Sequence, residues 1–333
     1  MKCFTHVPCC RPRWLLWCVL AGSWLPFPHA SGQPPATRLE QNGIIVGVDG
    51  AKGASITWLS FADSGNVVNI ADPGRLIQQS YYAGRSLDRQ TETQHTAWSP
   101  WPWNPIQGGG VGAWAQAGIL RREQDRLYSE TTPKLWDMAD ERAAAVMKQW
   151  TEFEPALPNV VRVTCEFVCL RENDDQWGAA VPRGQELPAC YFTRKFSRVA
   201  SYLGEGRWRD ERYRPGPPWF QVRPPLAAMG CFDQKDRGVA VFSPVATKPW
   251  NFGAAGAMGR NRPEDKPCMH LAPIEVLRLG PQSSLRYRYW LVVGTQSDVA
   301  ASLDTLMERY EGESLTLTTS ADPEESEKEH HAQ

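Results

Sequence analysis

Alternation of hydrophobic and polar residues predicts short β-strands along most of this chain. The clearest run spans residues 160–170, and its apolar set is Val161, Val163, Cys165, Phe167 and Cys169. Because successive side chains of a strand point to opposite faces, this run predicts a half-buried strand of an antiparallel sheet. Similar runs lie at residues 44–49, 54–60, 67–70, 75–82, 119–122, 126–132, 239–243, 274–279 and 285–293.

Two segments fit this β pattern less simply. Residues 143–154 are rich in alanine, which fits a helix, but they also alternate, and we favour a strand. Residues 297–310 predict a helix that Ser297 can cap, with Val299, Leu303 and Leu306 on one face. No break in composition divides the body of the chain. The pattern predicts a mainly β protein, an antiparallel β-sandwich with a short C-terminal helix.

Both ends of the chain differ from this single domain, which we place at residues 43–311. Residues 1–32 combine a weakly basic start, a short apolar run and small residues at the end, which is typical of a secretory signal peptide. A retained anchor is the alternative. No later stretch approaches the length of a spanning helix, so we expect a protein without a transmembrane segment, secreted or periplasmic. A polar lead-in occupies residues 33–42, and residues 312–333 predict an acidic, disordered tail.

Composition and charge exclude several classes of partner. Removal of residues 1–32 leaves 33 basic and 37 acidic residues, a net charge of −4, so the electrostatic footprint of a nucleic-acid-binding protein is absent. The 15 tryptophans stand out beside 27 glycines and 27 prolines. This mixture suits strands, turns and flat aromatic binding surfaces.

Metal-binding residues are sparse. Only His95 and His270 lie in the predicted domain, and Cys165 and Cys169 share one face of a strand about 13 Å apart, too far for a mutual disulfide. We interpret these two cysteines as buried strand residues, and we expect no metal site and no cofactor. Pairing among Cys190, Cys231 and Cys268 stays open.

The densest group of potential ligand contacts lies between residues 72 and 107. Sugar rings stack on aromatic side chains, and their hydroxyls need bidentate polar partners. Alternation over residues 75–82 places polar groups on both faces, so one face is expected to line a cleft. The alternative for this segment is a solvated edge strand. The alternative for the tryptophans is a hydrophobic plug over one end of the sandwich. The candidate binding residues are Asp72, Arg75, Gln78, Gln79, Tyr81, Trp101, Trp103, Asn104 and Gln107.

Three residues are candidates for acid–base chemistry. Glu186 and Glu275 are each expected at an end of a strand, and two carboxylates are what a glycosidase needs. Asp72 and Asp88, which flank the aromatic segment, are the other carboxylates that could belong to such a pair. His270 precedes a strand and is a candidate assisting acid or base, although a lone histidine is often structural. A lyase variant would use Tyr81 or His270 as the base, with Arg75 or Asn104 neutralising a uronate.

Several motifs of this chain resemble a known group of proteins. The segments are NIADPGRLIQQSYYAG (69–84), WSPWPWNPIQG (98–108), GASITW (53–58), QELP (185–188) and APIE (272–275). They are similar to a largely uncharacterised family of exported bacterial proteins that resemble galactose mutarotase-like β-sandwiches. The resemblance covers about residues 43–294 and implies a supersandwich with a concave face that binds sugar. It transfers no catalytic residue.

These observations together predict a secreted, carbohydrate-active protein that binds an oligo- or polysaccharide. The leading hypothesis is an enzyme that cleaves a glycosidic bond, as a glycoside hydrolase or, on a uronate substrate, a polysaccharide lyase. The alternative is a noncatalytic carbohydrate-binding or cell-envelope protein with the same aromatic residues.

Overall fold

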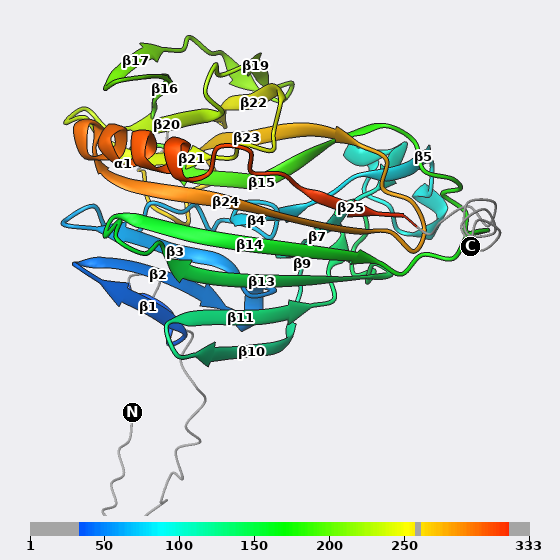
Figure 1. The fold of residues 1–333 in the computed structure, drawn as a ribbon. Helices are drawn as coiled ribbons and strands as arrows, with labels where there is room; N and C mark the ends of the chain where they lie inside the picture. Colours follow the sequence, from blue (N-terminus) through cyan, green and yellow to red (C-terminus); the bar gives the residue numbers. More distant parts are fainter. Residues whose placement is uncertain (1–32, 257–260, 320–333) are drawn as a thin grey trace, which may run out of the picture. The chain divides into compact units, whose positions relative to one another are not determined.

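The structure consists mainly of two large β-sheets with one α-helix against the second (Figure 1). It is a computed structural model that describes residues 33–256 and 261–319. The predicted signal peptide and most of the predicted tail lie outside the described residues, so secretion stays a prediction from the sequence. No described helix is long and apolar enough to cross a membrane.

The first sheet has eleven strands and carries the N-terminal part of the domain. Its order is β1-β2-β3-β4-β15-β23-β22-β18; β7 pairs with β4 and β12, and β19 pairs with β22. All its pairings are antiparallel except β18 with β22. Its strands are β1 Arg38–Gln41, β2 Ile44–Asp49, β3 Ser55–Phe61, β4 Ile77–Ser80, β7 Pro105–Ile106, β12 Lys134–Leu135, β15 Arg183–Thr193, β18 Pro215–Gly216, β19 Phe220–Val222, β22 Lys248–Ala255 and β23 Cys268–Leu277.

The second sheet has ten strands in the order β10-β11-β13-β14-β24-β21-β20-β16-β17, with β25 paired to β24. Its strands are β10 Ala117–Glu123, β11 Arg126–Thr131, β13 Ala145–Phe153, β14 Val160–Cys169, β16 Arg198–Gly204, β17 Arg207–Asp210, β20 Ala228–Phe232, β21 Arg237–Phe242, β24 Ser284–Thr295 and β25 Thr316–Thr318. Two small ribbons are formed by β5 Ala83–Leu87 with β6 Trp101–Trp103, and by β8 Gly109–Gly110 with β9 Ala113–Trp114. The 3-10 turns are η1 Gly50–Lys52, η2 Gln90–Glu92 and η3 Thr96–Trp98.

The main core lies between the inner faces of the two sheets. The apolar face predicted for β14 is fully buried there, with Phe167 at its centre. The Phe167 ring lies 4.4 Å from the ring of Tyr81 and 6.1 Å from that of Trp103, between ring centroids. The five described cysteines are buried free thiols. The predicted class, an antiparallel β-sandwich with a short C-terminal helix, is confirmed.

Helix α1, Gln296–Arg309, covers part of the outer face of the second sheet through a separate core. Val299, Leu303 and Leu306 are buried, as the sequence pattern predicted, together with Ala300 and Ser302. The cap differs from the prediction. Thr295 accepts a hydrogen bond from the Asp298 N–H, and the Asp298 carboxylate accepts one from the Thr295 N–H, so a capping box starts the helix two residues before Ser297.

Some predicted boundaries were wrong. Four residues of the polar lead-in form the edge strand β1, and the start of the predicted tail forms β25. Residues 67–70 form no strand and make only an isolated bridge from Val68 to Phe192. The ambiguous segment 143–154 is the strand β13, as favoured, because its alternate residues are buried between sheets.

The centre of the sandwich gives a direct test of this packing. Replacing Phe167 with alanine leaves a cavity beside Tyr81 and Trp103, which lowers the free energy of unfolding by about 3–5 kcal/mol. The control is Leu170→Ala, at a side chain that is 45% exposed, which changes stability by less than about 0.5 kcal/mol. Urea denaturation measures both; equal effects would contradict the proposed core.

Candidate functional site

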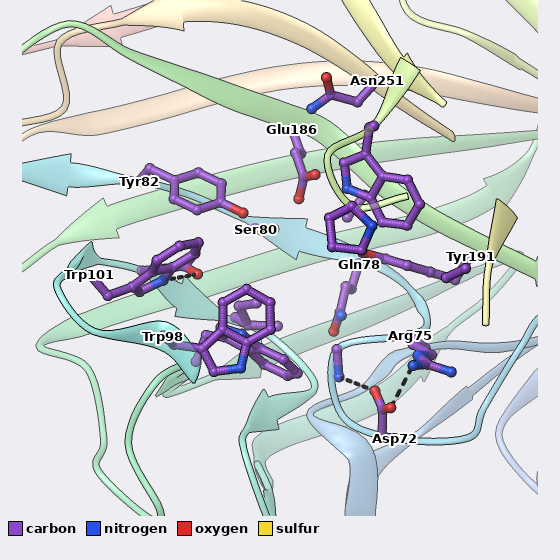
Figure 2. Close-up of a pocket in the computed structure, with 18 residues that line it drawn as sticks. Asp72, Arg75, Gln78, Ser80, Tyr82, Trp98, Trp101, Glu186, Tyr191 and Asn251 are labelled. Atoms are coloured by element: carbon purple, nitrogen blue, oxygen red, sulfur yellow. Dashed lines mark hydrogen bonds and ion pairs between the residues drawn. The ribbon is translucent and has the colours of Figure 1, made fainter. Parts of the chain in front are cut away.

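A cavity of about 400 Å³ opens on the outer face of the eleven-stranded sheet, away from the main core (Figure 2). Its size lies in the range of sites for small molecules. Strands β4, β15 and β22 supply its floor, and connecting segments supply its walls. The lining residues used below are Asp72, Gly74, Arg75, Gln78, Ser80, Tyr82, Trp98, Trp101, Asn104, Trp136, Glu186, Tyr191, Trp219 and Asn251.

Strand alternation decides which residues of the segment 75–82 reach the cavity. Gln78, Ser80 and Tyr82 point into it (Figure 2), and the intervening Gln79 and Tyr81 point into the core. The expectation that one face lines a cleft therefore holds. The candidate list mixed both faces, however, and Gln79 and Tyr81 do not contact a ligand in this cavity.

Three of the candidate binding residues that do not line the cavity form a polar network inside the sandwich. Tyr81 donates its hydroxyl hydrogen to Gln79 Oε1 at 2.9 Å, and Gln79 Nε2 donates to the backbone oxygen of Lys148 in the opposite sheet at 3.0 Å. Gln107 Oε1 accepts a hydrogen bond from the Gln79 N–H at 3.1 Å. Gln79 thus links the two sheets, and Tyr81 and Gln107 satisfy its other polar groups, since buried polar groups need partners.

Trp103 is also a core residue and not a stacking platform. Its side chain is 1% exposed, and the guanidinium of Arg171 lies 5.3 Å from the ring. The other tryptophan of the Trp-Pro-Trp segment, Trp101, does line the cavity. Residues two apart on a regular strand share a face, but the pairing of β6 with β5 is irregular, and Trp103 is buried while Trp101 lines the cavity. Only one of the predicted pair is therefore available for a ligand.

A bulge in β15 turns three residues toward the cavity. Glu186 pairs with Ser80 of β4, but Ala189 pairs with Gln78, so β15 contains one residue more than its partner. Beyond this bulge the inward and outward positions are exchanged. Glu186, Ala189 and Tyr191 therefore all line the cavity, although regular alternation would hide the last two.

The carboxylate of Glu186 projects into the cavity between the hydroxyls of Tyr82 and Tyr191 (Figure 2). Burial raises the pKa of both tyrosines above the usual value, and the negative charge of Glu186 raises them further. Both phenols are therefore neutral hydrogen-bond donors. Asn251 lies on the same side, with its Oδ1 accepting a hydrogen bond from Gln221, so that its amide nitrogen faces Glu186.

Glu275 does not line the cavity beside Glu186, so these two residues do not form the predicted pair of carboxylates. In the ladder between β15 and β23, Glu275 pairs with Gln185 while Glu186 pairs with Ile274. Neighbouring positions on a strand face opposite sides, so the two carboxylates point apart. Glu275 instead accepts hydrogen bonds from the backbone N–H and the hydroxyl of Thr247, at 2.8 and 2.6 Å.

His270 lies beside Glu186 but behind the cavity surface. Its side chain is fully buried, and its Nε2 is 3.3 Å from Glu186 Oε1. The imidazole packs in a tilted arrangement against the rings of Tyr191 and Trp219, each 4.4 Å away between centroids. His270 is thus not placed to act directly on a ligand, and the role of assisting acid or base must be corrected to an indirect one.

Asp72 is the second carboxylate that lines the cavity, in a turn before β4. Its Oδ1 accepts a hydrogen bond from the Gly74 N–H at 3.1 Å, and its Oδ2 lies 3.1 Å from Arg75 Nε. Burial raises the pKa of Asp72, against the opposing effect of the Arg75 charge. Gly74 keeps the turn close to the wall, because a Cβ there would lie 2.6 Å from the ring of Trp136.

Tryptophans form the walls. Trp98 packs edge to face against Trp101 and Trp136, with ring centroids 5.1 and 5.7 Å apart. Asn104 fixes this arrangement: its Oδ1 accepts a hydrogen bond from Trp101 Nε1 at 3.1 Å, and its Nδ2 donates to the backbone oxygen of Tyr81 at 2.7 Å. Asn104 is fully buried, and both ends of its amide are already hydrogen-bonded, so it orients the platform.

Gln78 likewise serves the scaffold more than a ligand. Its Oε1 accepts a hydrogen bond from the Gly108 N–H at 2.8 Å, and its Nε2 donates to the backbone oxygen of Pro73 at 3.0 Å. Of the candidate binding residues, Asp72, Arg75, Gln78, Trp101 and Asn104 do line the cavity, together with Glu186. Arg75 also donates a hydrogen bond to the backbone oxygen of Lys266.

Several cavity residues were missed in the candidate list. Tyr82 and Trp98 had a usable signal, because Tyr82 shares a strand face with Gln78 and Trp98 belongs to the same segment as Trp101. Tyr191 was hidden by the bulge. Trp136 and Trp219 come from distant loops, and only the topology places them at the site. Among the described residues, no group of three or more His, Cys, Asp or Glu side chains is arranged to hold a metal ion.

Comparison with known proteins finds similarity only among solved structures. No family model and no curated protein matches the chain. A galactose mutarotase-like protein from Clostridium acetobutylicum aligns with a TM-score of 0.41 and 10% identity, over 77% of this chain and 94% of its own. A candidate aldose 1-epimerase from Klebsiella pneumoniae subsp. pneumoniae aligns with a TM-score of 0.43 and 9% identity, over 81% of each chain. Such distant similarities assign neither a ligand nor a reaction.

The role of Asn104 can be tested without a ligand. Asn104→Ala leaves the Trp101 N–H and the Tyr81 carbonyl without partners, which lowers the free energy of unfolding by about 1–3 kcal/mol and frees the Trp101 ring. Near-ultraviolet circular dichroism should show the change in the tryptophan pair. Asn66→Ala is the matched control, because Asn66 also bonds backbone groups but lies outside the cavity; it should lose stability while keeping the tryptophan signal.

Proposed function

We propose that the protein is an enzyme that acts on a neutral carbohydrate in this cavity, with Glu186 as its acid–base residue. One observation carries the proposal: a carboxylate projects into an aromatic-walled cavity between two neutral phenols. Tryptophan rings stack on the apolar faces of sugar rings, and the tyrosine hydroxyls, Asn251 and Glu186 supply hydrogen-bonding groups for sugar hydroxyls.

The charges of the lining residues favour a neutral substrate. Asp72 and Glu186 are acidic, and Arg75 is the only basic residue among the described residues that line the cavity. The guanidinium of Arg75 is already held by Asp72 and the Lys266 carbonyl, and Asn104 is held by Trp101 and Tyr81. A uronate would therefore find no free cationic partner beside the Glu186 carboxylate, which disfavours the lyase variant.

Hydrolysis of a glycosidic bond is the reaction that we favour. Asp72 takes the role that was expected of Glu275, because it is the other carboxylate of the cavity. Its raised pKa suits a general acid, which must hold a proton to give to the leaving oxygen. Glu186 then acts as the general base or nucleophile across the bound sugar.

A noncatalytic carbohydrate-binding role is the second candidate. It is favoured by the hydrogen bonds of Asp72 to its own turn, which would also explain that residue as purely structural. A panel of neutral and acidic oligosaccharides separates the possibilities. New reducing ends from a neutral member support hydrolysis; ultraviolet-absorbing ends indicate elimination, anomer exchange without cleavage indicates proton transfer only, and retention without products indicates a binding protein.

Two matched substitutions test Glu186. Glu186→Gln removes the acid–base group and should lower kcat about 10²- to 10⁴-fold while leaving sugar retention intact. Glu275→Gln makes the same chemical change on the opposite face of the strand and should keep kcat close to that of the wild type. Steady-state kinetics with the hydrolysed sugar measure both, and full activity in Glu186→Gln contradicts the assignment.

The pH dependence tests Asp72. A general acid works only when protonated, so the rate falls as pH rises through its pKa, which burial raises. The charge of Arg75 opposes this rise, so Arg75→Gln should move the alkaline limb of the kcat profile to higher pH. Lys248→Gln, beside Glu275 and outside the cavity, should leave the limb in place. A limb that stays fixed in Arg75→Gln excludes Asp72 as the acid.

A further inference from the structure

His270 is an unusual group to find buried. Its side chain is fully buried, and neither ring nitrogen has a hydrogen-bond partner in the part of the chain that the structure describes. A buried polar group without partners costs stability, so its presence calls for an explanation. Glu186 Oε1 lies 3.3 Å from Nε2, which is close enough for an ion pair but lacks the alignment of a hydrogen bond.

Three adjacent strands fix the imidazole in this place. His270 of β23 pairs with Tyr191 of β15 on one side and with Gly253 of β22 on the other. The Tyr191 ring packs against the imidazole at an interplanar angle of 34°, and the Trp219 ring packs against it at 37°. Side-chain rotation of His270 is thus restricted, and Nε2 stays about 3.3 Å from Glu186 Oε1.

Gly253 allows the segment that carries Trp219 to lie close to the sheet. It has a φ of +145°, and a Cβ at this position would lie 3.3 Å from the Arg214 carbonyl oxygen and 3.8 Å from the Trp219 ring. The segment that carries Trp219 therefore lies directly over the sheet at this point. Because Tyr191 and Trp219 both line the cavity while His270 does not, a bound sugar meets these two rings and Glu186, with the imidazole behind them.

We infer that His270 is a positioning residue: it carries a proton on Nε2 and directs it to Glu186 Oε1, which holds that carboxylate toward the bound sugar. The inference rests on the proposed function and deepens it. Hydrogen bonds of this kind are often long in an empty site and shorten when substrate binds. The proton stays on His270 in this role, and the substrate exchanges protons only with groups that face the cavity.

Two substitutions separate positioning from packing. His270→Gln keeps an N–H near the place of Nε2 but loses the aromatic ring, and His270→Phe keeps the ring but loses both nitrogens. Positioning predicts that the Gln variant keeps most of its kcat, while the Phe variant loses about 10- to 100-fold in kcat with KM within about two-fold. Thermal unfolding should rank the two variants in the opposite order, because the Phe variant preserves the packing of the rings.

A measurement without turnover keeps this inference separate from the proposed function. In ¹⁵N-labelled protein the Nε2 of His270 should carry a proton that exchanges slowly with solvent. Its resonance should move in Glu186→Gln and stay in Glu275→Gln. If the wild type turns over no sugar, the proposed function fails, and this spectrum still decides the contact.

Two results would overturn the positioning role. One is wild-type kcat in His270→Phe together with loss of kcat in His270→Gln, which would make His270 a packing residue. The other is an Nε2 resonance that does not respond to Glu186→Gln. If neither variant folds, the spectra of the wild type and of the two glutamate variants decide alone.

Discussion

A carboxylate among aromatic rings is the constraint on which the site depends. Removing the charge of Glu186 from water is costly unless polar groups compensate for it. The structure places two neutral phenols, an amide nitrogen and a histidine around that carboxylate. The tryptophan walls add apolar surface, and the second carboxylate of the cavity, Asp72, is paired with Arg75. The contrast between the Glu186 carboxylate and the aromatic walls gives the cavity its chemical character.

The arrangement follows from the direction of side chains on three neighbouring strands. Alternation on β4 sends Gln78, Ser80 and Tyr82 outward, and the β15 bulge sends Glu186 and Tyr191 to the same face. The loops then add tryptophans from both sides. Polar groups on the opposite face of β4 join the two sheets, so the same short segment serves the core and the site.

Much of the fold could be predicted from the sequence, because alternation is a local signal. It located β2, β14 and the buried face of α1, and the favoured strand at residues 143–154 is present. Residues 67–70 show that this signal can mislead, since a short apolar run can be buried without pairing in a β-ladder. Part of the candidate site could also be predicted from the sequence, including Gln78 on the outward face of β4 and Trp101 in the neighbouring segment.

The rest of the site depends on information that one sequence does not contain. The bulge exchanges the two faces of β15, so it hid Tyr191, and a one-position offset in the ladder sends Glu275 away from Glu186. Trp136 and Trp219 reach the cavity through topology alone. The most direct measurement is a crystal structure of the Glu186→Gln protein with a neutral oligosaccharide. The account predicts a sugar ring stacked on Trp98 or Trp101, with an oxygen of its anomeric centre beside residue 186; a sugar bound at another face, with the cavity empty, would contradict it.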